Sequence, residues 1–153
     1  MNKTWLDQGV VIALDLDDFG RCAEHMGWSE YTPNIITGFI TEAVEELVSK
    51  HFGVVIWGLD RKRGTEEALL VFQLDYEMIA EELQELVTKV KSMAEGIDAP
   101  TSLSIGVAIG PLMRLKPETN NRKKTLAKDP TRVLAYKALR EAKKRGGNTI
   151  VRY

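Results

Sequence analysis

Residues 10–19 read VVIALDLDDF, an apolar run that ends abruptly in acidic residues. A short continuous run rich in β-branched residues is typical of a strand buried on both faces, so we predict a strand over residues 10–14. Side chains alternate across a strand, and Asp15 and Asp17 are therefore expected on one face of it. Ligands collect beyond the carboxyl ends of strands in open α/β sheets, which makes this acidic end the first candidate site.

The rest of the chain alternates between helical and strand patterns. Apolar residues at three-and-four spacing predict helices over residues 35–48, 76–93 and 131–144. Apolar runs predict further strands over residues 54–58, 68–72, 101–110 and 149–153. The first two of these strands form a hairpin with a long polar loop, and residues 111–130 are expected to be a surface loop or flap.

This order of elements predicts the fold class. Strand, helix, hairpin, helix, strand, helix, strand is typical of an α+β sandwich, in which helices pack on a mixed sheet of about five strands. A length of 153 residues suits a single domain covering residues 1–153.

Composition narrows the function classes. The hydrophobic fraction of 44% and the charged fraction of 28% are those of a globular protein. A formal net charge of -1 gives no basic field for duplex nucleic acid, although nucleotides remain possible ligands. Cys22 is the only cysteine, and no apolar run reaches the length of a membrane span or of a secretory signal core. A cytoplasmic protein without membrane contact is the expectation.

The acidic strand end suits a divalent cation. Carboxylate oxygens bind Mg²⁺ or Mn²⁺ together with triphosphate oxygens and water. Asp60, Glu66 and Glu67 in the hairpin loop are placed to bring more carboxylates beside Asp15, which would allow a two-metal arrangement. The alternative is structural, because acids at a strand end often begin a solvated turn and loop acids often pair with neighbouring basic residues.

A basic segment precedes two glycines near the carboxyl terminus. Lys143, Lys144 and Arg145 end the predicted helix just before Gly146 and Gly147. Cations at this end complement the helix dipole without any further function. In nucleotidyl transfer the same cations would neutralise a polyphosphate, and the glycines would let backbone amides approach it.

Taken together, these segments resemble the GGDEF-type cyclase domain over nearly the whole chain. The resemblance is carried by residues 10–19, the hairpin, LSIGVA at residues 103–108 and ALREAKKRGGN at residues 138–148. It implies a ferredoxin-like palm domain in which Asp15 binds metal through its side chain and Leu16 through its carbonyl. It also implies a triphosphate-binding set made of Asp17, Asp18, Phe19, Gly20, Lys143, Lys144 and Arg145.

The hairpin departs from the family signature in a way that leaves two readings. Asp60 follows Gly58 and Leu59 at the strand end, whereas Gly64 to Ala68 offers Glu66 within five consecutive residues. Asp60 is slightly favoured by its place after the strand, and the implied catalytic set is Asp15 with Asp60 and Glu66, the last two also binding metal.

Further departures bear on phosphate and base recognition. The family lysine after the phenylalanine is replaced by Gly20, and its arginine near the end is replaced by Gly147, with Arg145 as a substitute. The positions that read guanine in diguanylate cyclases fall near Ala23 and Thr32, so guanine specificity is not expected.

The small size and altered hairpin make the chain more similar to the minimal CRISPR polymerases. That family implies a homodimer that condenses nucleoside triphosphates, with ATP preferred, into a cyclic di- or oligonucleotide used in antiphage defence. Pyrophosphate is the other product.

Three other functions are compatible with the acidic strand end. A phosphohydrolase of the haloacid dehalogenase type would use Asp15 as nucleophile and Asp17 as general acid. A response-regulator receiver would use Asp17 or Asp18 with Asp60 for phosphorylation. A cyclase-like domain that binds nucleotide without turning it over is the third.

Overall fold

The computed structural model describes residues 5–113 and 129–153. They form, in order, β1 (Trp5–Leu16), α1 (Phe19–Met26), α2 (Ile35–Lys50), β2 (Val54–Trp57), β3 (Glu67–Phe72), the 3-10 turn η1 (Tyr76–Met78), α3 (Ala80–Gly96), β4 (Leu103–Met113), α5 (Pro130–Lys144) and β5 (Ile150–Arg152).

The strands form one mixed sheet in the order β2-β3-β1-β4-β5. β1 is central and pairs antiparallel with both β3 and β4, and β2 pairs antiparallel with β3. The pairing of β4 with β5 is parallel, and α5 is the crossover between them. The first four strands with their helices have the split βαβ arrangement of a ferredoxin-like fold, so the predicted α+β sandwich with a five-stranded mixed sheet is confirmed.

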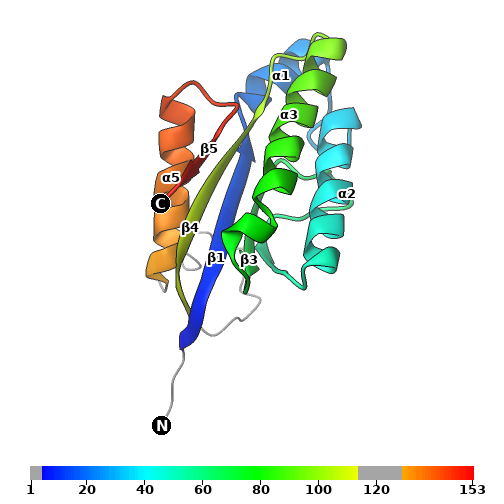
Figure 1. Ribbon diagram of the computed structural model, residues 1–153. Helices are drawn as coiled ribbons and strands as arrows, with labels where there is room; N and C mark the ends of the chain where they lie inside the picture. The colour runs from blue at the N-terminus through cyan, green and yellow to red at the C-terminus, as the bar shows by residue number, and fades with distance from the viewer. Residues whose placement is uncertain (1–4, 114–128) are drawn as a thin grey trace.

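Helices cover both faces of this sheet (Figure 1). On one face Val10, Ile12 and Leu14 of β1 join a core with residues of α1, α2 and α3. On the other face Val11 and Ala13 pack with residues of α5. All five of these β1 side chains are at most 1% exposed, which confirms a first strand buried on both faces.

Several boundaries differ from the sequence prediction. β1 begins at Trp5 rather than at residue 10, and its register with β4 shifts between Leu6 and Gln8. β4 continues to Met113, so the loop expected from residue 111 begins later, and most of that loop lies outside the described residues. α5 begins at Pro130, because Asp129 caps the helix through the Thr131 amide and proline is well tolerated in the first turn.

The short helix α1 was not predicted, because no helical pattern was identified between the acidic strand end and residue 35. Its buried residues Phe19, Cys22 and Ala23 face the core, which gives a helical stripe only one turn long. The helix ends at its C-cap residue Gly27, which adopts a left-handed conformation.

Within residues 5–113 and 129–153, no helix is long and apolar enough to cross a membrane.

Candidate active site

The acidic end of β1 points toward the face of the sheet that α5 covers. Asp15 lies directly opposite Glu67 of β3 and Ser104 of β4. Residues directly opposite on antiparallel strands project to the same face, so these three side chains are neighbours there. The register therefore brings together a strand-end aspartate and a hairpin glutamate that are far apart in the sequence.

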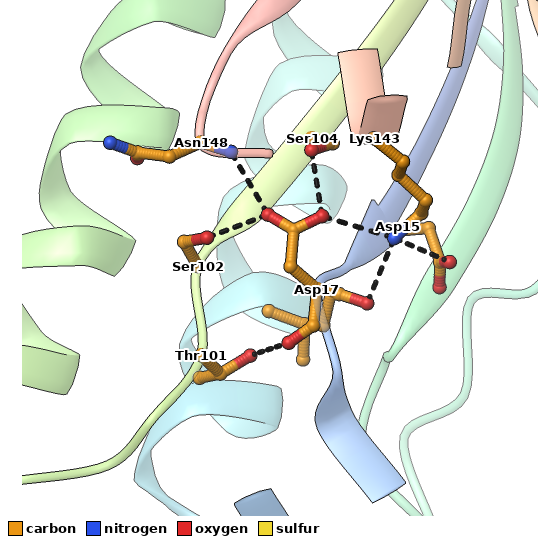
Figure 2. A network of polar contacts seen from close by, with 8 residues as sticks. Asp15, Asp17, Thr101, Ser102, Ser104, Lys143 and Asn148 are labelled. Carbon is orange, nitrogen blue, oxygen red and sulfur yellow. Dashed lines mark hydrogen bonds and ion pairs between the residues drawn. The ribbon is translucent and has the colours of Figure 1, made fainter. Parts of the chain in front are cut away.

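The carboxylate of Asp17 is held by four hydrogen bonds (Figure 2). Oδ2 accepts from the Ser102 hydroxyl at 2.6 Å and from the Asn148 amide at 3.0 Å. Oδ1 accepts from the Ser104 hydroxyl at 2.7 Å and from Lys143 Nζ at 3.1 Å. Asp17 thus joins the end of β1 to β4, α5 and the turn before β5.

These bonds also set the ionisation of Asp17. Burial would raise the pKa of its carboxyl, but the hydrogen bonds from the two serines, the Asn148 amide and Lys143 outweigh burial. The pKa is therefore held below the ordinary value of 3.8. Asp17 stays negatively charged at neutral pH and serves as an internal anion.

We expect Asp17→Asn to flatten the acid side of the stability profile. Because the folded-state pKa is lowered, the carboxylate adds stability above 3.8 that is lost as the pH falls through the folded value. Thermal melts from about pH 7 down to about pH 3 should therefore show a shallower decline in the variant. At neutral pH the variant should also be less stable, by about 1–3 kcal/mol, because buried donors lose a charged acceptor.

A matched control for this experiment is Glu24→Gln, which removes an exposed carboxylate from α1. It should keep the wild-type slope between neutral and acid pH. An unchanged slope in Asp17→Asn would contradict the assignment.

The ammonium of Lys143 is surrounded by oxygens from the end of β1. Nζ lies 3.1 Å from Asp15 Oδ2, 3.1 Å from Asp17 Oδ1 and 3.2 Å from the Leu16 carbonyl oxygen. Burial would lower the pKa of Lys143, but the two aspartates outweigh it and raise the pKa above the ordinary 10.5. Figure 2 shows the lysine reaching from α5 to Asp15 and Asp17.

The hairpin loop is anchored to α2 by Thr65. This residue is fully buried, its hydroxyl lies 2.7 Å from that of Thr41, and its amide donates to the Thr37 carbonyl at 3.1 Å. The anchor fixes the two residues that follow it. The Leu16 amide donates to the Glu66 carbonyl at 2.9 Å, which carries the β3 pairing to the end of β1.

The three hairpin acids occupy different positions. Asp60 Oδ1 accepts from the amides of Lys62 and Arg63, both at 2.9 Å, so its carboxylate closes a local turn. Arg61 pairs with Glu45 of α2 rather than with an acid of the loop. Glu66 and Glu67 are the pair beside β1, and Glu67 is the one in register with Asp15. The sequence already contained a signal for Glu67. It is the fourth of the five consecutive residues, Gly64 to Ala68, that can be compared with the family signature of the hairpin.

Glu66 is electrostatically coupled to the site. Burial raises the pKa of its carboxyl above the ordinary 4.5, and the charges of Glu30 and Asp15 add to that rise while Arg63 opposes it. An open pocket of about 520 Å³ lies along the hairpin, with Trp57, Asp60, Arg63, Glu66 and Glu67 among its lining residues.

The start of α1 lies immediately after the acidic strand end. Asp18 is the N-cap residue in a left-handed conformation, and the first helical bond runs from the Cys22 amide to the Asp18 carbonyl. The amides of Phe19 and Gly20 precede that bond and have no partner within the helix. The Phe19 ring is buried, whereas Gly20 is exposed with open space at its Cβ position. At Gly20, therefore, no side chain covers the backbone of the first helical turn.

The remaining predicted residues lie around the turn after α5. Lys144 and Arg145 are exposed, and Arg145 pairs with Glu141 at 3.1 Å. The glycines were expected to admit a phosphate, but a Cβ at Gly147 would lie 2.5 Å from Asp17 Oδ2. The turn therefore encloses the Asp17 carboxylate. Ala23 is buried in the core, which removes it from any contact with a base.

The oxygen atoms at the end of β1 supply some of the ligands that a hard divalent cation would need. Asp15 Oδ2, Asp17 Oδ1 and the Leu16 carbonyl already converge on one positive charge, that of Lys143, and Glu67 lies opposite Asp15. In the described part of the chain, no group of three or more His, Cys, Asp or Glu side chains is arranged to hold a metal by itself. A magnesium ion here would draw its other ligands from triphosphate and water.

Neither the models of known protein families nor the curated proteins include a match to this chain. Its function is therefore inferred from the geometry of the site and from the resemblance of its motifs.

Proposed function

We propose that this chain is a metal-dependent nucleotidyltransferase that condenses nucleoside triphosphates, with ATP preferred, into a cyclic di- or oligonucleotide. The observation that supports it best is that Asp15, the Leu16 carbonyl and Asp17 all contact one positive charge, the ammonium of Lys143. Glu67 lies in register with Asp15 on the neighbouring strand. The antiphage role of such a product is proposed from the resemblance to minimal CRISPR polymerases.

Different residues of the site have different roles in this reaction. A ribose hydroxyl oxygen of one triphosphate forms a bond to the α-phosphorus of another, and the bond from that phosphorus to the β-phosphate oxygen breaks, releasing pyrophosphate. Mg²⁺ or Mn²⁺ bound by Asp15, Leu16 and Glu67 would supply charge neutralisation for the triphosphate and the attacking oxygen. In this proposal the amides at the start of α1 and the ammonium of Lys143 bind phosphate oxygens.

We assign the role of proton acceptor to Glu66, whose backbone carbonyl accepts from the Leu16 amide at the end of β1. Its pKa is raised by burial and by neighbouring acids, so its carboxylate holds a proton more readily than an ordinary glutamate. Because one site presents one triphosphate, we propose that a second copy of the chain presents the other. The product is a ring when each copy attacks the triphosphate of its partner.

The fold and the site also weigh against two alternatives. A receiver domain would place the acidic strand in a parallel doubly wound sheet, but both neighbours of β1 are antiparallel. A phosphohydrolase would need Asp17 as general acid, yet the pKa of Asp17 is lowered and its carboxylate is saturated with donors.

The test is to incubate the purified chain with each radiolabelled nucleoside triphosphate and Mg²⁺ or Mn²⁺. We expect pyrophosphate release and a product that resists phosphatase, formed best from ATP. Release of inorganic phosphate alone would favour a hydrolase. Nucleotide binding without turnover would leave a sensor domain and would overturn the proposal.

A further inference from the structure

The ammonium of Lys143 lies among oxygens that the proposed function assigns in part to a bound metal ion. It has three N–H donors, and three oxygens surround it, namely Asp15 Oδ2, Asp17 Oδ1 and the Leu16 carbonyl, each within 3.2 Å. Asp15 and Leu16 are also the residues proposed above to bind the metal. The oxygens of Asp15 and Leu16 therefore contact the lysine ammonium in this structure and are also the proposed ligands of the metal.

The surroundings explain why a cation is needed there without any ligand. Asp15, Asp17 and Glu67 bring three carboxylates to one end of the sheet, and like charges this close repel one another. The Asp17 carboxylate already accepts four hydrogen bonds, and only one of them, that from Lys143, brings a positive charge. Lys143 offsets this charge from within the chain.

The lysine is also free to leave this position. Its side chain is 33% exposed, compared with 29% for Asp15 and 15% for Asp17. It lies in the last turn of α5, and the exposed Gly146, with nothing near its Cβ position, follows two residues beyond the helix end. A long flexible side chain there can move its charge by several ångströms with no change in the helix.

We propose that Lys143 is a built-in counter-ion that holds the cation position in the nucleotide-free protein and gives it up when a divalent ion enters. The displaced ammonium then binds the polyphosphate of the substrate. A divalent ion alone must compete with the lysine, whereas an ion that arrives with a triphosphate provides the lysine with another anion. Metal and nucleotide therefore bind cooperatively, and each raises the affinity for the other by the same factor.

This inference rests on the metal site of the proposed function. Direct measurements of Mn²⁺ binding distinguish a failure of the counter-ion role from a failure of the metal site. Mn²⁺ is titrated into the nucleotide-free chain and followed by electron paramagnetic resonance. In Lys143→Gln we expect Mn²⁺ to bind tighter on the order of tenfold, because no ammonium has to be displaced. Lys137→Gln removes an exposed positive charge from the same helix and should stay within about twofold of wild type.

Each outcome has a distinct meaning. Equal or weaker Mn²⁺ binding in Lys143→Gln, with binding still lost in Asp15→Asn, overturns the counter-ion role and leaves the metal site intact. Absence of Asp15-dependent Mn²⁺ binding in both wild type and Lys143→Gln overturns the metal site itself, and the inference with it.

A second measurement uses the wild-type chain and does not depend on the folding of a variant. Nitrogen-detected spectra of lysine ammonium groups follow Lys143 during addition of Mg²⁺. We expect its resonance to shift and to exchange faster with water as the ammonium leaves the aspartates, while that of Lys137 stays in place. A Lys143 resonance unchanged at saturating Mg²⁺ overturns the proposal.

Discussion

Asp15→Asn should reduce pyrophosphate release by a factor on the order of a thousand or more. The substitution keeps the size of the side chain but removes the charge that faces Lys143 and Glu67. A neutral amide is a poor ligand for a divalent ion, because it cannot neutralise the positive charge of the ion as a carboxylate does. The measurement is product formation at saturating triphosphate, with circular dichroism to show that the sheet is intact.

Three parallel substitutions in the hairpin sharpen this prediction. Glu67→Gln should approach the loss seen in Asp15→Asn, because Glu67 lies in register with Asp15. Glu66→Gln should lower the rate and remove its acid-side pH dependence, as expected for a proton acceptor with a raised pKa. Asp60→Asn should have the smallest effect of the three, since the carboxylate of Asp60 closes a local turn.

The control carboxylate is Glu81, which is exposed in the first turn of α3. Glu81→Gln should keep wild-type turnover. Turnover that survives in Asp15→Asn would contradict the whole site, whereas a greater loss in Asp60→Asn than in Glu67→Gln would assign the hairpin ligand to Asp60.

Much of the fold was predictable because its elements are local patterns. The apolar run at residues 10–14 and the helical stripe of α2 each identify their own structure, and both are confirmed. The helix α1 was missed because it has only two turns and contains Gly20, so its pattern is too short to stand out from a loop. The early start of β1 depends on pairing with β4, about a hundred residues away, which no local pattern shows.

The acidic residues of the candidate site could be predicted from the sequence, but the residues that contact them could not. Asp15 and Asp17 follow a recognisable strand, so their shared face follows from alternation alone. The donors to Asp17, by contrast, include Ser102 just before β4, Ser104 on β4 and Lys143, 126 residues away. Their positions depend on sheet register and on how α5 packs, and neither can be read from spacing along the chain.

Gly106→Ala should destabilise the chain by about 3 kcal/mol or more, a large effect for one methyl group. Gly106 lies on β4 beneath α5, and an added Cβ would lie 2.2 Å from both the Ala135 carbonyl oxygen and the Leu139 amide nitrogen. Both clashing atoms belong to helix backbone, so no side-chain rotation can relieve the contact. The helix has to shift, and urea unfolding followed by circular dichroism measures the cost.

The same substitution at Gly38 provides the control, because it adds a methyl group to a glycine with nothing within 4 Å of its Cβ position. Gly38 lies inside α2, where alanine favours the helix, so Gly38→Ala should stabilise the chain by about 0.5–1 kcal/mol. Opposite signs for one chemical change would show that close packing of α5 on β4 is responsible. That packing also carries Lys143 to Asp15, so a Gly106→Ala variant as stable as wild type would contradict the placement of the lysine as well as of the helix.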